Sequence, residues 1–455
     1  MSAPVLSIII LAAMFLLATV LPLNMGALAF VGAFLLGTVV LGMSTTDILA
    51  NFPGGLFLTI VGVTYLFAIA QNNGTIDLLV RGAVRMVGSR VALIPWVMFA
   101  ITAVITAVGA LSPAAVAIIA PIALSFAGKY KINPLLMGMM VIHGAQAGGF
   151  SPIAVYGVTV NGILAKTDLD FSPTALFLSS LVFNLVIAVV LFVVLGGRKL
   201  LSSRVGHFVE QAAEARMSVS VGAKAGSDVP FKGFGSGMYG PRDPAGDGVA
   251  ATKERSERIP QLVTIAGLIA LAVIALGFKV DVGFVSITIA IVVALVSPAA
   301  QKGAINKISW STVLLICGML TFVGVLEEAG TIEFVSNGVA GLGMPLLAAL
   351  LICFIGAVVS AFASSTAILA ALIPLAVPFL STGEIGAVGV ICALAVASTI
   401  VDVSPFSTNG ALVLANAPEG VDKDRFYKQI LGYSGIVIVA GPVLAWLALV
   451  VPGWL

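Results

Sequence analysis

Long apolar segments separated by short polar connections run along most of the chain. A helix needs about 20 mainly apolar residues to cross the hydrocarbon core of a bilayer. Ten segments meet this criterion and predict full spans, at residues 5–22, 25–42, 54–71, 133–164, 173–196, 260–277, 281–298, 310–327, 385–416 and 429–452. No Lys or Arg precedes the first of them, which favours a membrane span over a cleaved signal peptide.

Two further apolar segments, residues 91–127 and 344–381, are too long for one span each. Each carries a small polar cluster at its middle, Ser112-Pro113 in the first and Ser364-Ser365-Thr366 in the second. Such clusters are typical of a re-entrant hairpin, which enters and leaves the membrane on one side. Two full spans of about 18 residues per segment are the alternative, and length alone does not exclude them.

Residues 197–259 interrupt the apolar pattern with a stretch rich in Gly, Lys, Ser and Asp, which predicts a flexible linker. It separates an N-terminal half, residues 1–196, from a C-terminal half, residues 260–455.

The basic residues fall on one side of the predicted spans. If the segments alternate between sides, 20 of the 22 Lys and Arg residues lie on one side, and only Lys166 and Lys279 lie on the other. If the ten Lys and Arg residues of the linker are left out, 10 basic residues still lie on one side and 2 on the other. By the positive-inside rule the richer side is cytoplasmic, so we expect a cytoplasmic linker and both termini outside.

The composition agrees with a polytopic membrane protein. Of the 455 residues 60% are hydrophobic and 9% are charged, whereas soluble domains have about 25% charged residues and disordered chains have low hydrophobicity. The net charge of +2 gives no basic excess for nucleic acid, so the expected partners are small solutes and lipids. Cys317, Cys353 and Cys392 are widely spaced in apolar runs and are interpreted as small core residues.

The two halves resemble each other. NGTID at residues 73–77 recurs as AGTIE at 329–333, and GGFSP at 148–152 aligns with VDVSP at 401–405 at an offset of 253. The same offset pairs Ser112 with Ser365 and Pro121 with Pro374 without a gap. Because each half has five full spans, the second must be inverted relative to the first, as in secondary transporters. The predicted fold is an all-α polytopic membrane protein with two inverted repeats, each with one broken span and one re-entrant hairpin.

Ser-Pro is a good helix start, because Ser can cap a free N–H and Pro fits the first turn. Ser112-Pro113, Ser151-Pro152 and Ser404-Pro405 fall in the middle of apolar segments, and Ser365-Thr366 occupies the fourth equivalent place. Four half-helix N-termini would then converge near the membrane centre, each with a partial positive charge. Such a site receives an anion, most commonly a carboxylate. The alternative is that each pair marks an ordinary kink.

No Lys or Arg lies deep in a predicted span, so helix dipoles and a co-bound cation must compensate a bound anion. Asp402 is the one acid at membrane depth, and we expect it to carry a proton or ligate sodium, with a structural cap as the alternative. Gly148-Gly149 could unwind and offer carbonyls to a cation, and Thr408 and Asn409 add polar groups. His143 is interpreted as a satisfied bundle histidine, and Gln146 and Asn161 are weaker candidates.

At these residues the sequence resembles the MatC-type dicarboxylate (malonate) carriers, within the divalent anion:sodium symporter fold of the ion transporter superfamily. The stretches that carry the resemblance are NMGALAFVGAFLLG, VTYLFAIAQNNGTID, GALSPAAVAIIAPIALSFA, MVIHGAQAGGFSPIAVYG, ASSTAILAALIPLAVPF and VDVSPFSTNGALVLAN. The resemblance implies a homodimer with a scaffold domain and a transport domain that moves like an elevator.

The wider family is similar in carrying Ser-Asn-Thr at both hairpin tips for sodium and carboxylate. Here the second tip reads Ser364-Ser365-Thr366, a near match, whereas the first reads Leu111-Ser112-Pro113. The resemblance therefore implies substrate and sodium contacts at Ser365 and Ser112, with Asp402 sharing the coupling.

The sequence predicts a secondary active transporter in a bacterial-type cytoplasmic (inner) membrane that takes up a small, malonate-like dicarboxylate with sodium or protons. Sodium is the only bound cofactor that we expect. The alternative is a cation/proton antiporter or an inorganic-anion carrier on the same fold. An enzyme is not expected, since the chain has no GxSxG, HExxH or phosphate-binding glycine loop.

Overall fold

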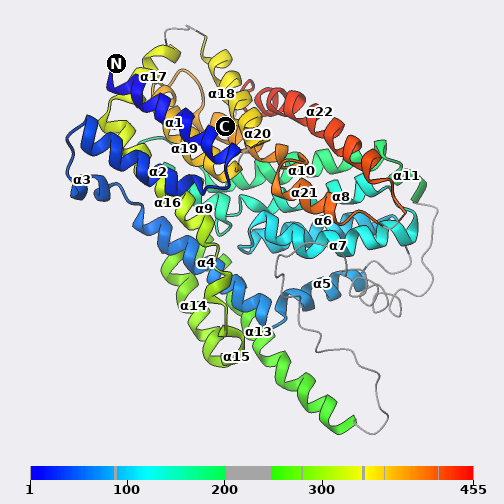
Figure 1. The fold of residues 1–455 in the computed structure, drawn as a ribbon. Helices are drawn as coiled ribbons and strands as arrows, with labels where there is room; N and C mark the ends of the chain where they lie inside the picture. The colour runs from blue at the N-terminus through cyan, green and yellow to red at the C-terminus, as the bar shows by residue number, and fades with distance from the viewer. Residues whose placement is uncertain are drawn as a thin grey trace.

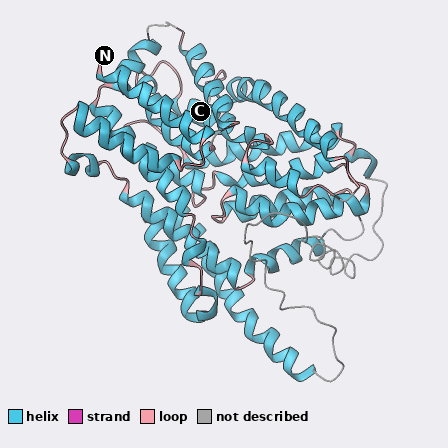
Figure 2. Ribbon diagram, viewed as in Figure 1, coloured by secondary structure: helices cyan, strands magenta, loops and turns pink. Residues whose placement is uncertain are grey.

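The computed structural model describes residues 2–86, 90–200, 247–277, 280–340, 344–362, 364–418 and 420–453. Within these ranges the chain folds into helices, and no β-strand forms (Figures 1 and 2). Seven helical segments of the described chain are long and apolar enough to cross a membrane, and shorter apolar helices accompany them. The protein is therefore a multi-pass, all-helical membrane protein.

Up to residue 200, the described part of the chain forms eleven α-helices, the last of them very short, and one π-helix. They are α1 (Ala3–Val20), α2 (Met25–Phe34), η1 (Leu35–Val40), α3 (Thr45–Ala50), α4 (Gly54–Asn72), α5 (Thr75–Met86), α6 (Leu93–Ala107), α7 (Ser112–Tyr130), α8 (Pro134–Gly149), α9 (Val155–Leu164), α10 (Pro173–Val194) and α11 (Gly197–Leu200).

The second half repeats this order with few changes. Its elements are α13 (Asp247–Gly277), α14 (Val282–Val296), α15 (Pro298–Gln301), η2 (Ile305–Lys307), α16 (Trp310–Glu328), α17 (Thr331–Ala340), α18 (Pro345–Ser360), α19 (Ser365–Leu380), α20 (Ala387–Ile400), η3 (Val401–Val403), α21 (Thr408–Ala415) and α22 (Lys423–Leu449).

The ten predicted spans coincide with these helices, with small differences at their ends. The segments 133–164 and 385–416 are each split by a turn, into α8 and α9 and into α20 and α21. The last helix, α22, begins at Lys423 rather than near 429, because Asp422 accepts hydrogen bonds from the backbone N–H groups of Asp424 and Arg425. This cap extends the apolar helix with polar turns.

The short helices α3, α5 and α17 were not predicted, nor were the single turns α15 and η2. Each is shorter than a span and mixes polar with apolar residues, so a search for long apolar segments passes over them. In α5 the apolar residues Ile76 and Val80 are buried, whereas Asp77 and Arg81 are not. This pattern is typical of an amphipathic helix.

Most of the predicted linker, residues 201–246, lies outside the described residues, as does Lys279. The ends of the segment 197–259 are helical, because α11 covers Gly197–Leu200 and α13 begins at Asp247. The helix that contains the predicted span from residue 260 therefore begins earlier, at Asp247. Lys, Glu and Arg in the stretch before Pro260 favour helix and extend α13 beyond its apolar part.

The two predicted hairpin segments are helical hairpins. In the first, α6 and α7 are separated by residues 108–111, and in the second a break between Ser360 and Ser365 separates α18 from α19. The first arms, α6 and α18, have 15 and 16 residues, which is less than the about 20 that a full span needs. Re-entry from one side remains a prediction that their length supports.

Buried residues form separate clusters that divide the helices into groups. One large cluster joins α6–α10 to α18–α22 and includes residues of α4 and α5. A second cluster joins α1, α2 and α16 to the hairpin helix α19, and a third joins α4, α13 and α14. The hairpins and broken spans of both halves thus share one core, which the remaining helices flank.

Close helix pairs join the two halves, because α2 packs on α16 and α4 packs on α14. A Cβ atom at Gly26 would lie 2.0 Å from the Leu314 carbonyl oxygen, and one at Gly318 would lie 2.1 Å from the Gly26 carbonyl oxygen. Small residues at such crossings let backbones approach, which drives helix association in membranes.

Gly26→Ala is expected to lower the melting temperature of the purified protein in detergent, since the methyl group would displace the α16 backbone. Overpacking of this kind costs about 1–3 kcal/mol. Gly435→Ala is the matched control, because Gly435 lies in α22 with no atom within 4 Å of an added Cβ. Equal melting temperatures for the two variants would contradict the close crossing.

Candidate functional site

Four breaks in the helices come together inside the large core. α7 and α19 begin at the two hairpin tips, and α9 and α21 begin after the breaks in the two broken spans. α7 packs against α21, and α19 packs against α9, so each hairpin tip meets the broken span of the other half. Hydrogen bonds between residues at the helix starts show that the four N-termini lie near one another.

The Ser-Pro pairs of the broken spans form turns rather than helix caps. The Ser151 carbonyl accepts from the Ala154 N–H at 2.9 Å, and the Ser404 carbonyl accepts from the Ser407 N–H at 3.0 Å. Pro thus takes the second position of a four-residue turn, where its fixed φ fits best. The expectation that Ser151 and Ser404 cap the half-helices is wrong.

The half-helices begin three to four residues later, where the turns end. Ser407 is the N-cap of α21 and accepts from the Gly410 N–H at 3.2 Å. Its hydroxyl also donates to the Asp402 carbonyl oxygen. Ser151 instead donates its hydroxyl to the Ala107 carbonyl at 2.7 Å, which ties the first broken span to the first hairpin.

Asp402 lies at the centre of a hydrogen-bond network and is only 7% exposed. Ser365 Oγ donates to its Oδ1 at 2.5 Å. Gln146 Nε2 and Tyr156 OH donate to its Oδ2 at 2.9 Å and 3.4 Å. Ser360 Oγ in turn donates to Ser365 Oγ at 2.8 Å. The carboxylate is therefore held by donors from α8, α9 and the second hairpin.

Ser112, at the first hairpin tip, belongs to the same network. Its Oγ accepts from Asn409 Nδ2 at 2.8 Å and from Gln146 Nε2 at 3.4 Å. Gln146 therefore connects the first tip to Asp402, which connects to Ser365 at the second tip. One side-chain network links both hairpins and both broken spans.

Two buried oxygen atoms in this network have no hydrogen-bond partner. They are Gln146 Oε1 and Asn409 Oδ1. Buried polar atoms are nearly always satisfied, so such atoms call for an explanation. Together with the Asp402 carboxylate they are hard oxygen ligands of the kind that alkali and alkaline-earth cations take in proteins. The residues present thus fit a small cation such as sodium.

The network is symmetric in position but asymmetric in charge. The offset of 253 pairs the following site residues: Ser112 with Ser365, Ser151 with Ser404, Tyr156 with Asn409, and Gly149 with Asp402. The carboxylate therefore occurs only in the second half, where the first half has a glycine.

The remaining predicted site residues lie around the same breaks. Pro113 is in the first turn of α7, Thr366 is buried in the first turn of α19, and Thr408 is exposed at the start of α21. Pro152 and Pro405 are half-buried in their turns.

Gly148 and Gly149 do not unwind the helix, because α8 continues to Gly149. A Cβ at Gly148 would lie 2.0 Å from the Ala103 carbonyl oxygen, so its glycine serves close packing on α6. Its carbonyl accepts from the Ser151 N–H at 3.1 Å. A direct role of these two residues in ion binding stays a prediction.

Gln146, Tyr156 and Ser360 were weighted too low or missed. Gln146 was a weak candidate because a single amide in an apolar helix carries no local pattern. The repeat offset offers the one available signal for Tyr156, since it pairs this residue with the predicted site residue Asn409. Asn161 lies apart, lining a small pocket with Cys392 between α9, α10 and α20.

His143 is a fully buried, fully bonded residue of the large core, as expected. Its Nδ1 lies 2.8 Å from Asn184 Oδ1 and its Nε2 lies 2.7 Å from Tyr433 OH. Asn184 and Tyr433 come from α10 and α22, so the histidine fastens α8 to both helices. The three cysteines are likewise buried and free.

Tyr433→Phe is expected to reduce thermal stability and to leave transport near normal, because it removes one partner of His143 without touching Asp402. Buried hydrogen bonds in membrane proteins contribute about 0.6 kcal/mol each. Melting temperature and solute uptake are measured on the same preparation. Loss of uptake with unchanged stability would assign His143 a functional role instead.

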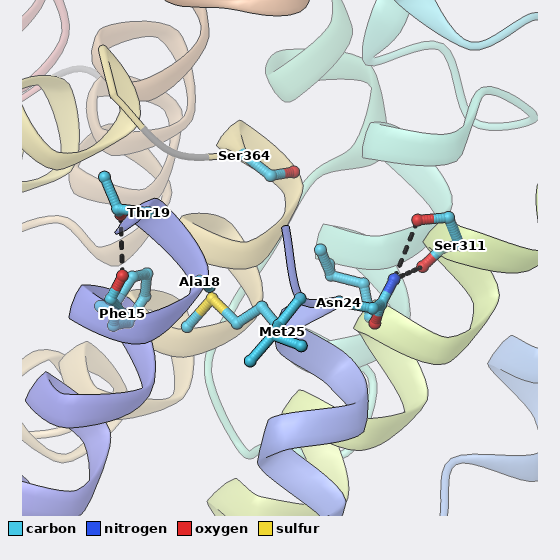
Figure 3. A pocket seen from close by; sticks show the side chains of 9 residues that line it. Phe15, Ala18, Thr19, Asn24, Met25, Ser311 and Ser364 are labelled. Atoms are coloured by element: carbon cyan, nitrogen blue, oxygen red, sulfur yellow. Dashed lines mark hydrogen bonds between the residues drawn. The ribbon is translucent and has the colours of Figure 1, made fainter. Parts of the chain in front are cut away.

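A pocket of about 160 Å³ lies beside the network, between the second hairpin tip and the ends of α1, α2 and α16. Figure 3 shows Ser364 on one side of it and the hydrogen-bonded pair Asn24 and Ser311 on the other. Asn24 Nδ2 donates to Ser311 Oγ at 2.9 Å. The exposed Ser364 thus faces the flanking helices, whereas its neighbour Ser365 faces Asp402.

Comparison with known proteins agrees with this architecture. A family model described as the dicarboxylate carrier protein MatC N-terminus matches residues 1–149. The fold is similar to the crystal structure of the YdaH transporter from Alcanivorax borkumensis, with a TM-score of 0.59 at 15% sequence identity. That match covers 90% of this chain and 88% of the other. No curated protein sequence matches the chain.

Proposed function

We propose that this protein is a secondary active transporter that takes up a small, malonate-like dicarboxylate together with sodium ions or protons. The observation that carries the proposal is the convergence of four half-helix N-termini on one buried carboxylate network. The match of residues 1–149 to a dicarboxylate carrier family supports both the process and the substrate class.

The substrate carboxylates would bind at the helix N-termini. Free N–H groups and partial positive charge at each N-terminus favour an anion. No Lys or Arg is among the buried residues that the structure describes, so these N-termini are the available source of positive potential. Hydroxyls at the tips, from Ser112, Ser364, Ser365 and Thr366, can donate to carboxylate oxygens.

The coupling ion would bind at Asp402. A buried carboxylate near a bound dianion is unfavourable unless a proton or a cation neutralises it. The unpartnered oxygens of Gln146 and Asn409 support sodium, whereas the donors around Asp402 allow a proton. Co-binding of this positive charge would raise the affinity for the anionic substrate, which is how a symporter couples the two fluxes.

Movement of one helix group against the other would provide alternating access. The hairpins and broken spans share one large core, and α19 also packs on the flanking helix α16, so the sliding surface would run through contacts such as this one. The elevator-like motion and the homodimer that the resemblance implies belong to this proposal.

The second candidate is a cation/proton antiporter on the same fold. Its supporting observation is that the network contains one titratable carboxylate and two free oxygen ligands, which would serve a cation alone. An inorganic-anion carrier would use the same helix N-termini.

Uptake into proteoliposomes separates these functions. Purified protein is reconstituted and supplied with labelled malonate under an inward sodium gradient, an inward proton gradient, both, or neither. The proposal expects accumulation above equilibrium with at least one gradient, and competition by unlabelled dicarboxylates. Sodium-driven proton movement without malonate uptake would favour the antiporter, and malonate-independent phosphate or sulfate uptake would favour the inorganic-anion carrier.

A further inference from the structure

Two serine hydroxyls form a chain that ends on the Asp402 carboxylate. Ser360 Oγ donates to Ser365 Oγ at 2.8 Å, and Ser365 Oγ donates to Asp402 Oδ1 at 2.5 Å. Ser360 is the last residue of α18 and Ser365 is the first of α19, so the chain joins the two arms of the second hairpin. All three residues are buried. The hydroxyls therefore take their partners from the protein or from a bound solute.

The direction of these hydrogen bonds follows from the number of protons. A hydroxyl has one proton to donate, and an ionised carboxylate can only accept. Ser365 therefore gives its one proton to Asp402, and Ser360 is the donor to Ser365. A substrate carboxylate is also only an acceptor. Ser365 cannot donate to the substrate while it donates to Asp402.

The two oxygens of Asp402 differ in their partners. Oδ2 accepts from Gln146 and Tyr156, whereas Ser365 is the only described residue that donates to Oδ1. A coupling ion bound at Oδ1 would replace the positive charge density that the Ser365 hydroxyl supplies. Ser365 Oγ would then turn a lone pair toward the ion and rotate its proton away, with no covalent bond broken.

The charge that controls this hydroxyl is that of Asp402. Among the described titratable groups on the helices that contact Asp402 or η3, only Tyr156 is hydrogen-bonded to the carboxylate. The others are His143, Cys353, Cys392, Lys423, Asp424, Arg425, Tyr427, Lys428 and Tyr433.

The first hairpin tip lacks this chain of hydroxyls. Ser112 Oγ accepts from two side-chain amides, and no described acceptor takes its own proton. Ser112 can thus donate to a substrate whether or not an ion is bound. At the offset of 253, the positions of Ser360, Ser365 and Asp402 are occupied by Ala107, Ser112 and Gly149. The dependence on an ion is confined to the second tip.

We propose that Ser365 couples the ion to the substrate by moving its one hydrogen bond from Asp402 to a substrate carboxylate when the ion neutralises Asp402. This mechanism deepens the proposed function and rests on it. Ser360 is a positioning residue, because its bond to Ser365 Oγ persists in both states and fixes the oxygen about which the proton turns. Without the ion, Asp402 and the substrate compete for the same proton, so the empty carrier binds substrate weakly.

Malonate binding to the purified protein tests this switch. The dissociation constant is measured by titration calorimetry for the parent and for Ser365→Ala, in sodium buffer at low pH and in sodium-free choline buffer at high pH. With coupling ions, Ser365→Ala should weaken binding about tenfold or more, the effect of losing a hydrogen bond to a charged group. Without them the loss should be under about twofold, because Asp402 already holds the hydroxyl. Protonation of malonate itself cancels in each ratio.

Ser381→Ala is the matched control. Ser381 is exposed at the other end of α19 and donates to the Val377 carbonyl at 2.9 Å. This variant should bind malonate as the parent does in both buffers.

A double-mutant comparison covers an ion-free affinity that is too weak to measure in the parent. Leucine cannot hold the hydroxyl, so adding Ser365→Ala to Asp402→Leu should weaken malonate binding about tenfold in both buffers. Equal losses from Ser365→Ala in the two buffers in the parent, or a loss under about twofold in the Asp402→Leu background, would overturn the switch. A parent that binds no malonate in either buffer would instead defeat the proposed function itself.

Discussion

Asp402→Asn is expected to abolish accumulation of substrate against its gradient while retaining exchange of substrate across the membrane. Asn keeps the shape of the side chain and can still accept from Ser365, which lies 2.5 Å from the carboxylate. It cannot take up a proton or neutralise a cation, so the coupling charge is lost. Exchange does not require the unloaded carrier to return, and it therefore tolerates the loss. Accumulation and exchange of labelled malonate are measured in the same proteoliposomes.

Asp281→Asn is the control for this variant. Asp281 is exposed and caps α14, accepting from the Phe284 N–H at 3.0 Å, a role that Asn also fills. It should accumulate substrate normally. If Asp402→Asn accumulated as much as the parent at equal protein amounts, Asp402 would have no coupling role and would be a structural residue of η3.

Gln146→Leu is expected to lower uptake at least tenfold. Gln146 donates to Asp402 and contacts Ser112, so its loss leaves a buried carboxylate short of a donor and separates the two hairpin tips. A hydrogen bond to a charged group contributes about 1.5–3 kcal/mol, and 1.4 kcal/mol corresponds to a factor of ten. Initial rates at several substrate and sodium concentrations measure whether substrate affinity, ion affinity or both decrease.

Thr399→Val provides the comparison, because Thr399 occupies the equivalent place in the second half at the offset of 253. Its hydroxyl bonds only to its own helix, donating to the Ala395 carbonyl at 2.9 Å. Uptake by this variant should stay within about twofold of the parent. A Gln146→Leu variant as active as Thr399→Val would show that the bridge between the hairpins is dispensable.

The spans could be predicted because length and hydrophobicity decide them directly. A segment that must cross hydrocarbon has to satisfy its own backbone, so an apolar run of span length becomes a helix whatever its neighbours are. The short amphipathic helices α5 and α17 form for a different reason, because each needs other helices to cover its apolar face. That cover comes from elements far along the chain, as in the hydrogen bond between Ser7 of α1 and Thr331 of α17.

The location of the candidate site could be predicted from the sequence, but the hydrogen bonds between its residues could not. Internal symmetry and Ser-Pro pairs placed the four breaks together, and Asp402 was identified as the one acid at depth. The partners of Asp402 lie up to 256 residues away in sequence, and Gln146 is one of them. Such a contact follows from the way α8 and η3 pack, and no local pattern encodes it. The turns at Ser151 and Ser404 were misjudged because a Ser-Pro pair fits a turn and a cap equally well.

The glycine crossings between the halves also affect how the protein is made. Gly26 meets Leu314, which follows it by 288 residues, so α2 lacks its closest partner until most of the chain has been synthesised. At about 5–20 residues per second, this interval lasts about 15–60 s. During that time the nascent first half holds its crossing surface open to lipid or to an insertion factor. Slowing translation in the second half should therefore reduce the yield of assembled protein more than slowing it in the first.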